Sequence, residues 1–140
     1  MHWTIYIDPE VNCAFGKYFG DLDLGRLNNA AADMYNHPDY REGMNSLRDA
    51  REVTVPADIS FGSLFHGSRG LVNEFDDKLG ACKWAIVVDD PENYAKLNQY
   101  LESGRLDHTP VHRKAFQDID KAKAWLGLAE DYEIKFPAPG

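Results

Sequence analysis

The segment Cys82-Lys83-Trp84-Ala85-Ile86-Val87-Val88, followed by Asp89-Asp90-Pro91, decides the fold class. Its apolar run is short, nearly unbroken and rich in β-branched residues, which predicts a strand covered on both faces. Asp90 is a suitable N-cap, and Pro91 suits the first position of a helix. A buried strand that leads directly into a helix is typical of α/β sheets, so we expect this segment to be the central strand of such a sheet.

Downstream of this strand the pattern alternates between helix and strand. We predict a helix from Pro91 to Ser103, a strand from Val111 to Phe116, and a helix that Asp118 caps and Gly127 closes. The segment from Tyr132 to Phe136 alternates polar and apolar residues and completes the chain.

Upstream, alternation predicts a hairpin of two strands, Trp3 to Ile7 and Val11 to Phe19, joined at Asp8-Pro9-Glu10. A helix over residues 24–36 follows, because apolar residues recur there at intervals of three and four. Asp23 is suited to cap this helix.

The middle of the chain contains the least regular pattern. Met44 to Asp49 predicts a short third strand, and Ala50 to Asp58 a charged connection that contains a proline. Ser60 is a plausible N-cap for a second helix that ends at Gly80. Its apolar stripe consists of Phe61, Leu64, Phe65, Val72, Phe75 and Leu79.

The element order predicts an α/β fold with a mixed sheet: an N-terminal β-hairpin, then alternating helices and mostly parallel strands (ββαβαβαβα). No repeat or Pro/Gly/Ser-rich linker interrupts the 140 residues, so we expect one domain over residues 1–140.

Composition excludes several classes of function. Lys and Arg number 15 and Asp and Glu 23, a formal net charge of −8, which disfavours nucleic acid and anionic membranes as partners. The sequence contains no apolar run long enough to predict a transmembrane segment, and its first residues do not resemble a secretory signal. The two cysteines form no metal or redox motif, so we expect a cytoplasmic protein.

Four short motifs resemble the SpoIIAA-like group of the STAS superfamily, the fold of anti-sigma-factor antagonists. They are Ile7-Asp8-Pro9-Glu10, Gly20-Asp21-Leu22, Leu47-Arg48-Asp49-Ala50-Arg51, and the ending from Phe116 to Leu126, a strand that finishes in Phe followed by an Ala-x-x-Trp-Leu type helix. The resemblance spans nearly the whole chain and implies the same mixed sheet. Fold transfers by such a resemblance more safely than function does.

The resemblance also implies a regulatory serine. In the antagonist branch, a serine in an Asp-Ser-Ser-Gly turn at the start of the second helix is phosphorylated, which controls binding to a partner kinase. The corresponding segment here, Asp58-Ile59-Ser60-Phe61-Gly62, lacks the serine doublet, and Ser60 is the candidate phosphorylation site. The alternative is that Ser60 only caps a helix.

A second implication concerns ligands, since other SpoIIAA-like proteins resemble the CRAL-TRIO lipid-binding fold. Three glycines in the second helix, Gly62, Gly67 and Gly70, could leave a groove for a small apolar ligand or a protein partner, or could instead allow close packing or break the helix. The candidate binding residues on this segment are Phe61, Leu64, Phe65, His66 and Ser68. The segment fails as a phosphate-binding loop because Ser68 and Arg69 replace the required Lys and Ser/Thr.

Arg48 and Arg51 complete the set of candidate binding residues. If they follow the third strand, they lie at the carboxyl end of the sheet, where they could hold an anion near Ser60. The alternative is that they form solvated ion pairs with Asp49 and Glu52.

Signatures of metal, cofactor or nucleophilic chemistry are absent from the sequence. On an extended strand His108 and His112 would lie about 13 Å apart, too far to share one ion. Cys13 and Cys82 fall in apolar runs, where a thiol is normally inert. We therefore expect no metal, no cofactor and no enzyme.

Three hypotheses remain. The first is a non-enzymatic module that binds a protein partner or a small apolar, lipid-like ligand. The second is a protein switched by phosphorylation of Ser60, and the third is a small enzyme that uses Arg48, Asp49 and His66 on an anionic substrate. Aromatic residues make up 12% of the chain, and a homodimer that buries some of them is a further hypothesis.

Overall fold

The computed structural model describes residues 1–58, 60, 79–103 and 110–137. The elements are β1 (His2–Asp8), β2 (Cys13–Asp21), α1 (Leu24–Tyr35), β3 (Asn45–Thr54), β4 (Cys82–Val87), α4 (Pro91–Glu102), β5 (Val111–Phe116) and α5 (Ile119–Trp125). The helix predicted between Ser60 and Gly80 falls almost entirely outside the described residues, and so do the candidates Phe61, Leu64, Phe65, His66 and Ser68.

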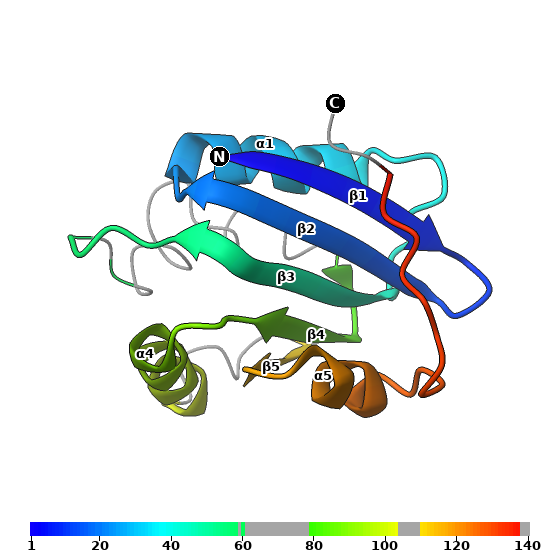
Figure 1. Ribbon diagram of the computed structural model, residues 1–140. Coiled ribbons are helices and arrows are strands. Elements are labelled where there is room, and N and C mark those ends of the chain that lie inside the picture. Colours follow the sequence, from blue (N-terminus) through cyan, green and yellow to red (C-terminus); the bar gives the residue numbers. More distant parts are fainter. Residues whose placement is uncertain (59, 61–78, 104–109, 138–140) are drawn as a thin grey trace.

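The described strands form one mixed sheet in the order β1-β2-β3-β4-β5 (Figure 1). β1 and β2 pair antiparallel, and every later neighbour pairs parallel. The predicted hairpin and the predicted α/β mixed sheet are therefore confirmed.

Two details of the sheet differ from the prediction. Cys82–Val87 is an interior strand, but the central position belongs to β3. β3 also continues to Thr54, where a connection was expected from Ala50 onward. The continuation is stable because β2 supplies backbone partners as far as the pair Asp21 and Thr54, while the charged side chains of Arg51 and Glu52 stay exposed.

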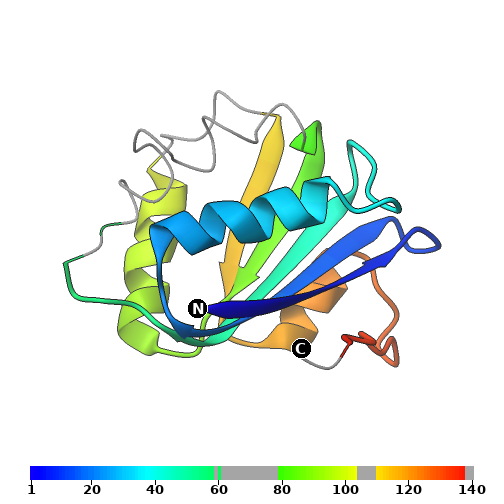
Figure 2. The ribbon, with the colours of Figure 1, turned by 90° about the horizontal axis from the view of Figure 1, so that it is seen from above.

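Helices cover both faces of the sheet, and α1 and α5 lie on opposite sides of it (Figure 2). On the face toward α1, which we call the α1 face, Trp84 and Val88 pack with Leu97 of α4, and Ala14 packs with Met34 of α1. On the other face, the α5 face, buried side chains pack against α5 and the C-terminal tail; they include Cys13, Phe15, Leu47, Ala85, Val87 and Phe116.

The three predicted N-caps are confirmed. The carboxylates of Asp23, Asp90 and Asp118 each accept a hydrogen bond from a backbone N–H in the first turn of α1, α4 and α5, respectively. These bonds satisfy donors that a helix start leaves without intrahelical partners. Among the described helices, none is both long and apolar enough to cross a bilayer.

The alternating tail covers the α5 face as extended chain. Tyr132, Ile134 and Phe136 pack against the buried cluster, and the ring of Tyr132 stacks on Phe15 at 5.7 Å. The Tyr132 hydroxyl donates to Asp8 Oδ2 at 2.6 Å, which joins the tail to the end of β1.

Gly80 provides a stability test at the entrance to β4. Its φ is +64°, and an added Cβ would lie 3.2 Å from the backbone nitrogen of Gly43 and 2.7 Å from Glu42 Cγ. We expect Gly80→Ala to lower the free energy of unfolding by about 1–3 kcal/mol for the backbone conformation alone, with a further loss from crowding. Chemical denaturation of the wild type and of Gly80→Ala would measure this loss in the free energy of unfolding.

The matched control is Gly127→Ala. Gly127 also has a positive φ, +80°, but an added Cβ there would meet nothing within 4 Å. Equal losses in the two variants would contradict the crowding that we assign to Gly80.

Candidate functional site

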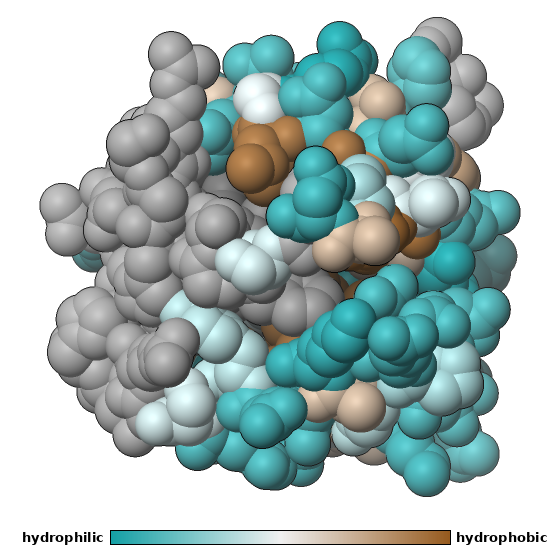
Figure 3. Space-filling model, turned by 90° about the vertical axis from the view of Figure 1, so that its left-hand side faces the viewer, coloured by the Kyte–Doolittle hydropathy of each residue, from teal (hydrophilic) through white to brown (hydrophobic). Residues whose placement is uncertain are grey.

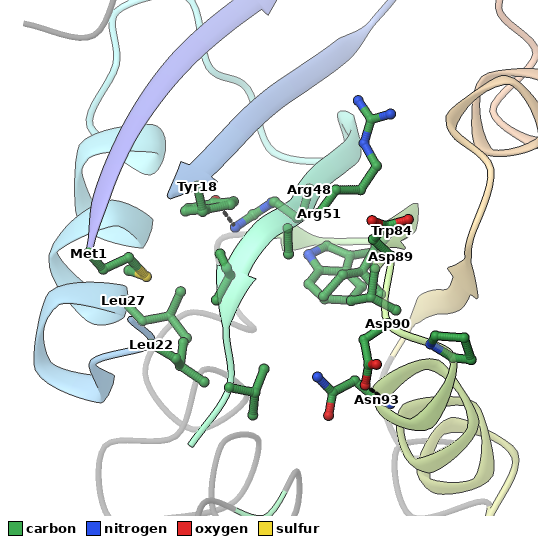
Figure 4. A pocket seen from close by; sticks show the side chains of 16 residues that line it. Met1, Tyr18, Leu22, Leu27, Arg48, Arg51, Trp84, Asp89, Asp90 and Asn93 are labelled. Atoms are coloured by element: carbon green, nitrogen blue, oxygen red, sulfur yellow. Dashed lines mark hydrogen bonds between the residues drawn. The ribbon is translucent and has the colours of Figure 1, made fainter. Parts of the chain in front are cut away.

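A pocket of about 390 Å³ lies on the α1 face, at the ends of β2, β3 and β4 (Figure 4). Its walls come mainly from the ends of these strands, from the segments that follow them, and from α1 and α4. The apolar side chains include Leu22, Leu27, Val53, Val55, Trp84, Ile86 and Val88, and the polar ones include Tyr18, Arg48, Arg51, Asp89, Asp90 and Asn93. Ligands of open α/β sheets bind outside the carboxyl ends of the strands, which is where this pocket lies.

The surface at this end of the sheet is mixed in character. Figure 3 views it directly, and hydrophobic side chains are visible near the middle of the face between hydrophilic ones. Leu22, Leu27 and Ile86 are only half-buried, so apolar surface gathers at the pocket without being fully covered by the described residues.

Arg48 is a buried charged residue of the pocket wall. It projects from the centre of β3 and is only 4% exposed. Its Nε donates to Ser46 Oγ at 2.7 Å, its Nη1 to Tyr18 Oη at 3.1 Å, and its Nη2 to Tyr35 Oη at 3.0 Å. Figure 4 shows the guanidinium extending toward Tyr18. Three elements, β2, β3 and α1, therefore converge on one cation.

The partners of this cation are neutral. No carboxylate of the described residues forms an ion pair with Arg48. Its guanidinium carbon lies 5.7 Å from the ring centre of Trp84 and 5.9 Å from that of Tyr35, so aromatic faces supply part of the stabilisation. Burial lowers the pKa of Arg48, but the hydroxyls of Tyr18 and Tyr35 raise it, and the net result is a raised pKa. Arg48 is thus a buried permanent charge.

Asp49 and Arg51 belong to the other side of the sheet. Successive strand residues point to opposite faces, so Asp49 shares the α5 face with Leu47 while Arg48 lies on the α1 face. Asp49, 2% exposed, accepts from Arg51 Nε at 2.9 Å and from Arg51 Nη2 at 2.8 Å. These bonds raise the pKa of Arg51. Although Arg51 touches the rim of the pocket, its guanidinium points away from it (Figure 4).

Comparison with known proteins shows a likeness in fold. No protein-family model matches the chain, and no curated protein matches it. A crystal structure of an uncharacterized protein of the DUF3478 family from Shewanella loihica PV-4, which has a SpoIIAA-like fold, superposes with a TM-score of 0.55. The match covers 90% of this chain and 95% of that one at 17% identity. This chain has a SpoIIAA-like fold.

The SpoIIAA-like sheet separates residues that the sequence placed together. The two arginines were expected either as an anion-binding pair or as solvated ion pairs at the strand end. Arg48 and Arg51 instead lie within β3 and on opposite faces. The ion pair of Arg51 with Asp49 is confirmed, whereas Arg48 pairs with hydroxyls, and Glu52 lies 3.5 Å from Lys17. The expectation that Arg48 is solvated is wrong because tyrosines distant in sequence cover it.

Ser60, the candidate phosphorylation site, is exposed and follows the end of β3. The helix that it was expected to cap lies outside the described residues, so phosphorylation of Ser60 stays a prediction. The enzyme hypothesis placed Arg48, Asp49 and His66 in one catalytic centre. His66 lies outside the described residues, and the side chains of Arg48 and Asp49 lie on opposite faces of the sheet.

Sequence reasoning missed most of the pocket. Val53 and Val55 alternate with Thr54, a period-two pattern that could have extended the third strand and placed both valines at its end. Ile86 and Val88 were assigned to a strand, but which face they occupied could not be decided. Tyr18 and Tyr35 carried no signal that they would meet Arg48.

Thiols and histidines of the described residues offer no assembled reactive group. Cys13 is buried on the α5 face, away from the pocket, as expected for a strand core, while Cys82 at the start of β4 is only half-buried. Exposed His112 packs edge-on against Trp125 at 5.3 Å. No three His, Cys, Asp or Glu side chains within the described ranges are grouped to hold a metal ion.

Cys13 gives a test of burial by chemical labelling. Burial raises the pKa of its thiol to about 12, although Arg48 acts in the opposite direction. Since the thiolate is the reactive form, the native thiol stays protonated at pH 8 and should not react with Ellman's reagent. Native wild type and native Cys13→Ala should release the same amount of rapidly formed chromophore, and unfolded wild type should release one equivalent more than unfolded Cys13→Ala. An extra rapid equivalent from the native wild type would contradict this assignment.

Proposed function

We propose that this protein is a non-enzymatic binding module that holds a small, mostly apolar ligand in the pocket at the ends of β2, β3 and β4. The observation that carries the proposal is the pocket itself, about 390 Å³ in volume and lined largely by aliphatic side chains. That volume falls within the usual range for small-molecule sites, roughly 300–1,000 Å³.

The apolar walls supply the driving force. Leu22, Leu27 and Ile86 are half-buried, so a ligand that covers them removes apolar surface from water at about 25 cal/mol per Å². The walls come from separate strands and from two helices that the same sheet supports. A site on such supports is largely formed before the ligand arrives, which favours binding because little order has to be created.

The polar groups of the pocket support binding more than catalysis. Asp90 accepts a hydrogen bond from the backbone N–H of Asn93, because it caps α4. Arg48 donates to three hydroxyls and forms no ion pair with a carboxylate of the described residues. A catalytic centre needs a nucleophile or general acid within reach of an activating partner, and the described lining offers no such pair.

A dye-binding experiment tests this proposal. Nile red, which is uncharged, should bind with raised fluorescence, and Leu27→Gln should weaken its binding several-fold because a polar side chain then replaces part of the apolar wall. Leu24→Gln is the matched control, since Leu24 lies on the same helix, is 38% exposed and does not line the pocket. Native mass spectrometry would give the stoichiometry.

Two outcomes would overturn the proposal. The first is a wild-type protein that binds no Nile red, and the second is an equal loss of binding in the two leucine variants. Thermal unfolding of each variant distinguishes a change in the pocket from a loss of folded protein.

A further inference from the structure

We propose that the ligand of this pocket is an aliphatic carboxylate whose head group binds Arg48. This inference rests on the proposed function, because it assigns the chemistry of a ligand in the same pocket. It depends on the hydrogen bonds of one guanidinium, the charges around it and the position of the apolar walls.

The hydrogen bonds of Arg48 leave donors unused. A guanidinium carries five N–H groups. Three of them donate to Ser46, Tyr18 and Tyr35, and the remaining two have no acceptor among the described residues. Both lie on the terminal nitrogens, each of which has one N–H committed to a tyrosine. A side chain that is only 4% exposed therefore keeps unused donors next to a pocket that it lines.

The charge of Arg48 is also uncompensated. Moving a cation out of water is costly unless an opposite charge or sufficient hydrogen bonds replace the solvent. Three hydroxyls and the aromatic rings of Tyr35 and Trp84 replace part of the solvent around the Arg48 guanidinium. No described carboxylate pairs with this guanidinium. A ligand carboxylate would supply the missing charge and accept from the unused donors. Such charge-assisted bonds are stronger than bonds between neutral groups.

The apolar side chains of the pocket indicate the chemistry of the rest of the ligand. Leu27, Val53, Ile86 and Val88 line the pocket beside Arg48, so an aliphatic chain attached to the carboxylate would lie along them. Exposed Asp89 and Asp90 stand at the segment that follows β4 and would repel a second negative charge. The pocket therefore favours a monoanion with its charge at Arg48 over a doubly charged phosphate ester.

Competition with Nile red compares three probes of equal chain length at neutral pH: decanoate, decanol and decyl phosphate. We expect wild type to bind decanoate at least about tenfold more tightly than decanol, the effect of hydrogen bonds to a charged group, and more tightly than decyl phosphate. Arg48→Met should lower decanoate affinity by roughly tenfold to a hundredfold and leave decanol affinity within about threefold. Arg41→Met, at an exposed arginine that does not line the pocket, is the control with the same change in net charge.

The outcomes separate the two proposals. If Nile red and decanol bind but decanoate binds no better than decanol, the carboxylate assignment is wrong and the binding module stands. Tighter binding of decyl phosphate, or equal losses in Arg48→Met and Arg41→Met, would also overturn the assignment. If no probe binds wild type, the proposed function itself fails. Should Arg48→Met not fold, the order of affinities in wild type decides.

Discussion

The rest of the structure depends on the hydrogen bonds that the buried guanidinium of Arg48 donates. Hydroxyls from β2, β3 and α1 meet on it, so it connects two parallel strands to the helix that covers them. Gly16 makes this possible, since a Cβ at that position would lie 2.6 Å from the Tyr18 hydroxyl. Removing one member of such a buried network is costly, because the hydrogen-bonding groups of its partners are then left without partners. The network therefore fixes the position of α1 over the sheet.

The same constraint shapes the pocket. α1 and α4 contribute opposite walls at the ends of the strands, and Arg48 lies between them as a buried charge beside the aliphatic part of the lining (Figure 4). On the α5 face, the buried charge of Asp49 is compensated by an ion pair with Arg51. One strand thus carries two buried charges on opposite faces, of which only one has its counter-charge within the described protein. That asymmetry is why the α1 face, and not the α5 face, is the candidate for ligand binding.

Local patterns in the sequence predict much of this architecture, including the opening hairpin, the helix N-caps at Asp23, Asp90 and Asp118, and the strand from Val111 to Phe116. These features depend on neighbouring residues, which is why they could be predicted. The length of β3 could not, because its charged second half is stabilised by pairing with β2. Nor could the burial of Arg48, whose partners Tyr18 and Tyr35 lie 30 and 13 residues away. The pocket depends on these long-range contacts, so local patterns in the sequence could not predict its lining.

The measurement that tests this account most directly is solvent exchange at the Nε–H of Arg48, observed by nitrogen-15 NMR and assigned with Arg48→Lys. Its Nε donates to Ser46 in a buried setting, so the account predicts a resolved signal that exchanges with water far more slowly than the signal of exposed Arg41. An Arg48 signal that exchanges as fast as that of Arg41 would show a solvated side chain and contradict the account.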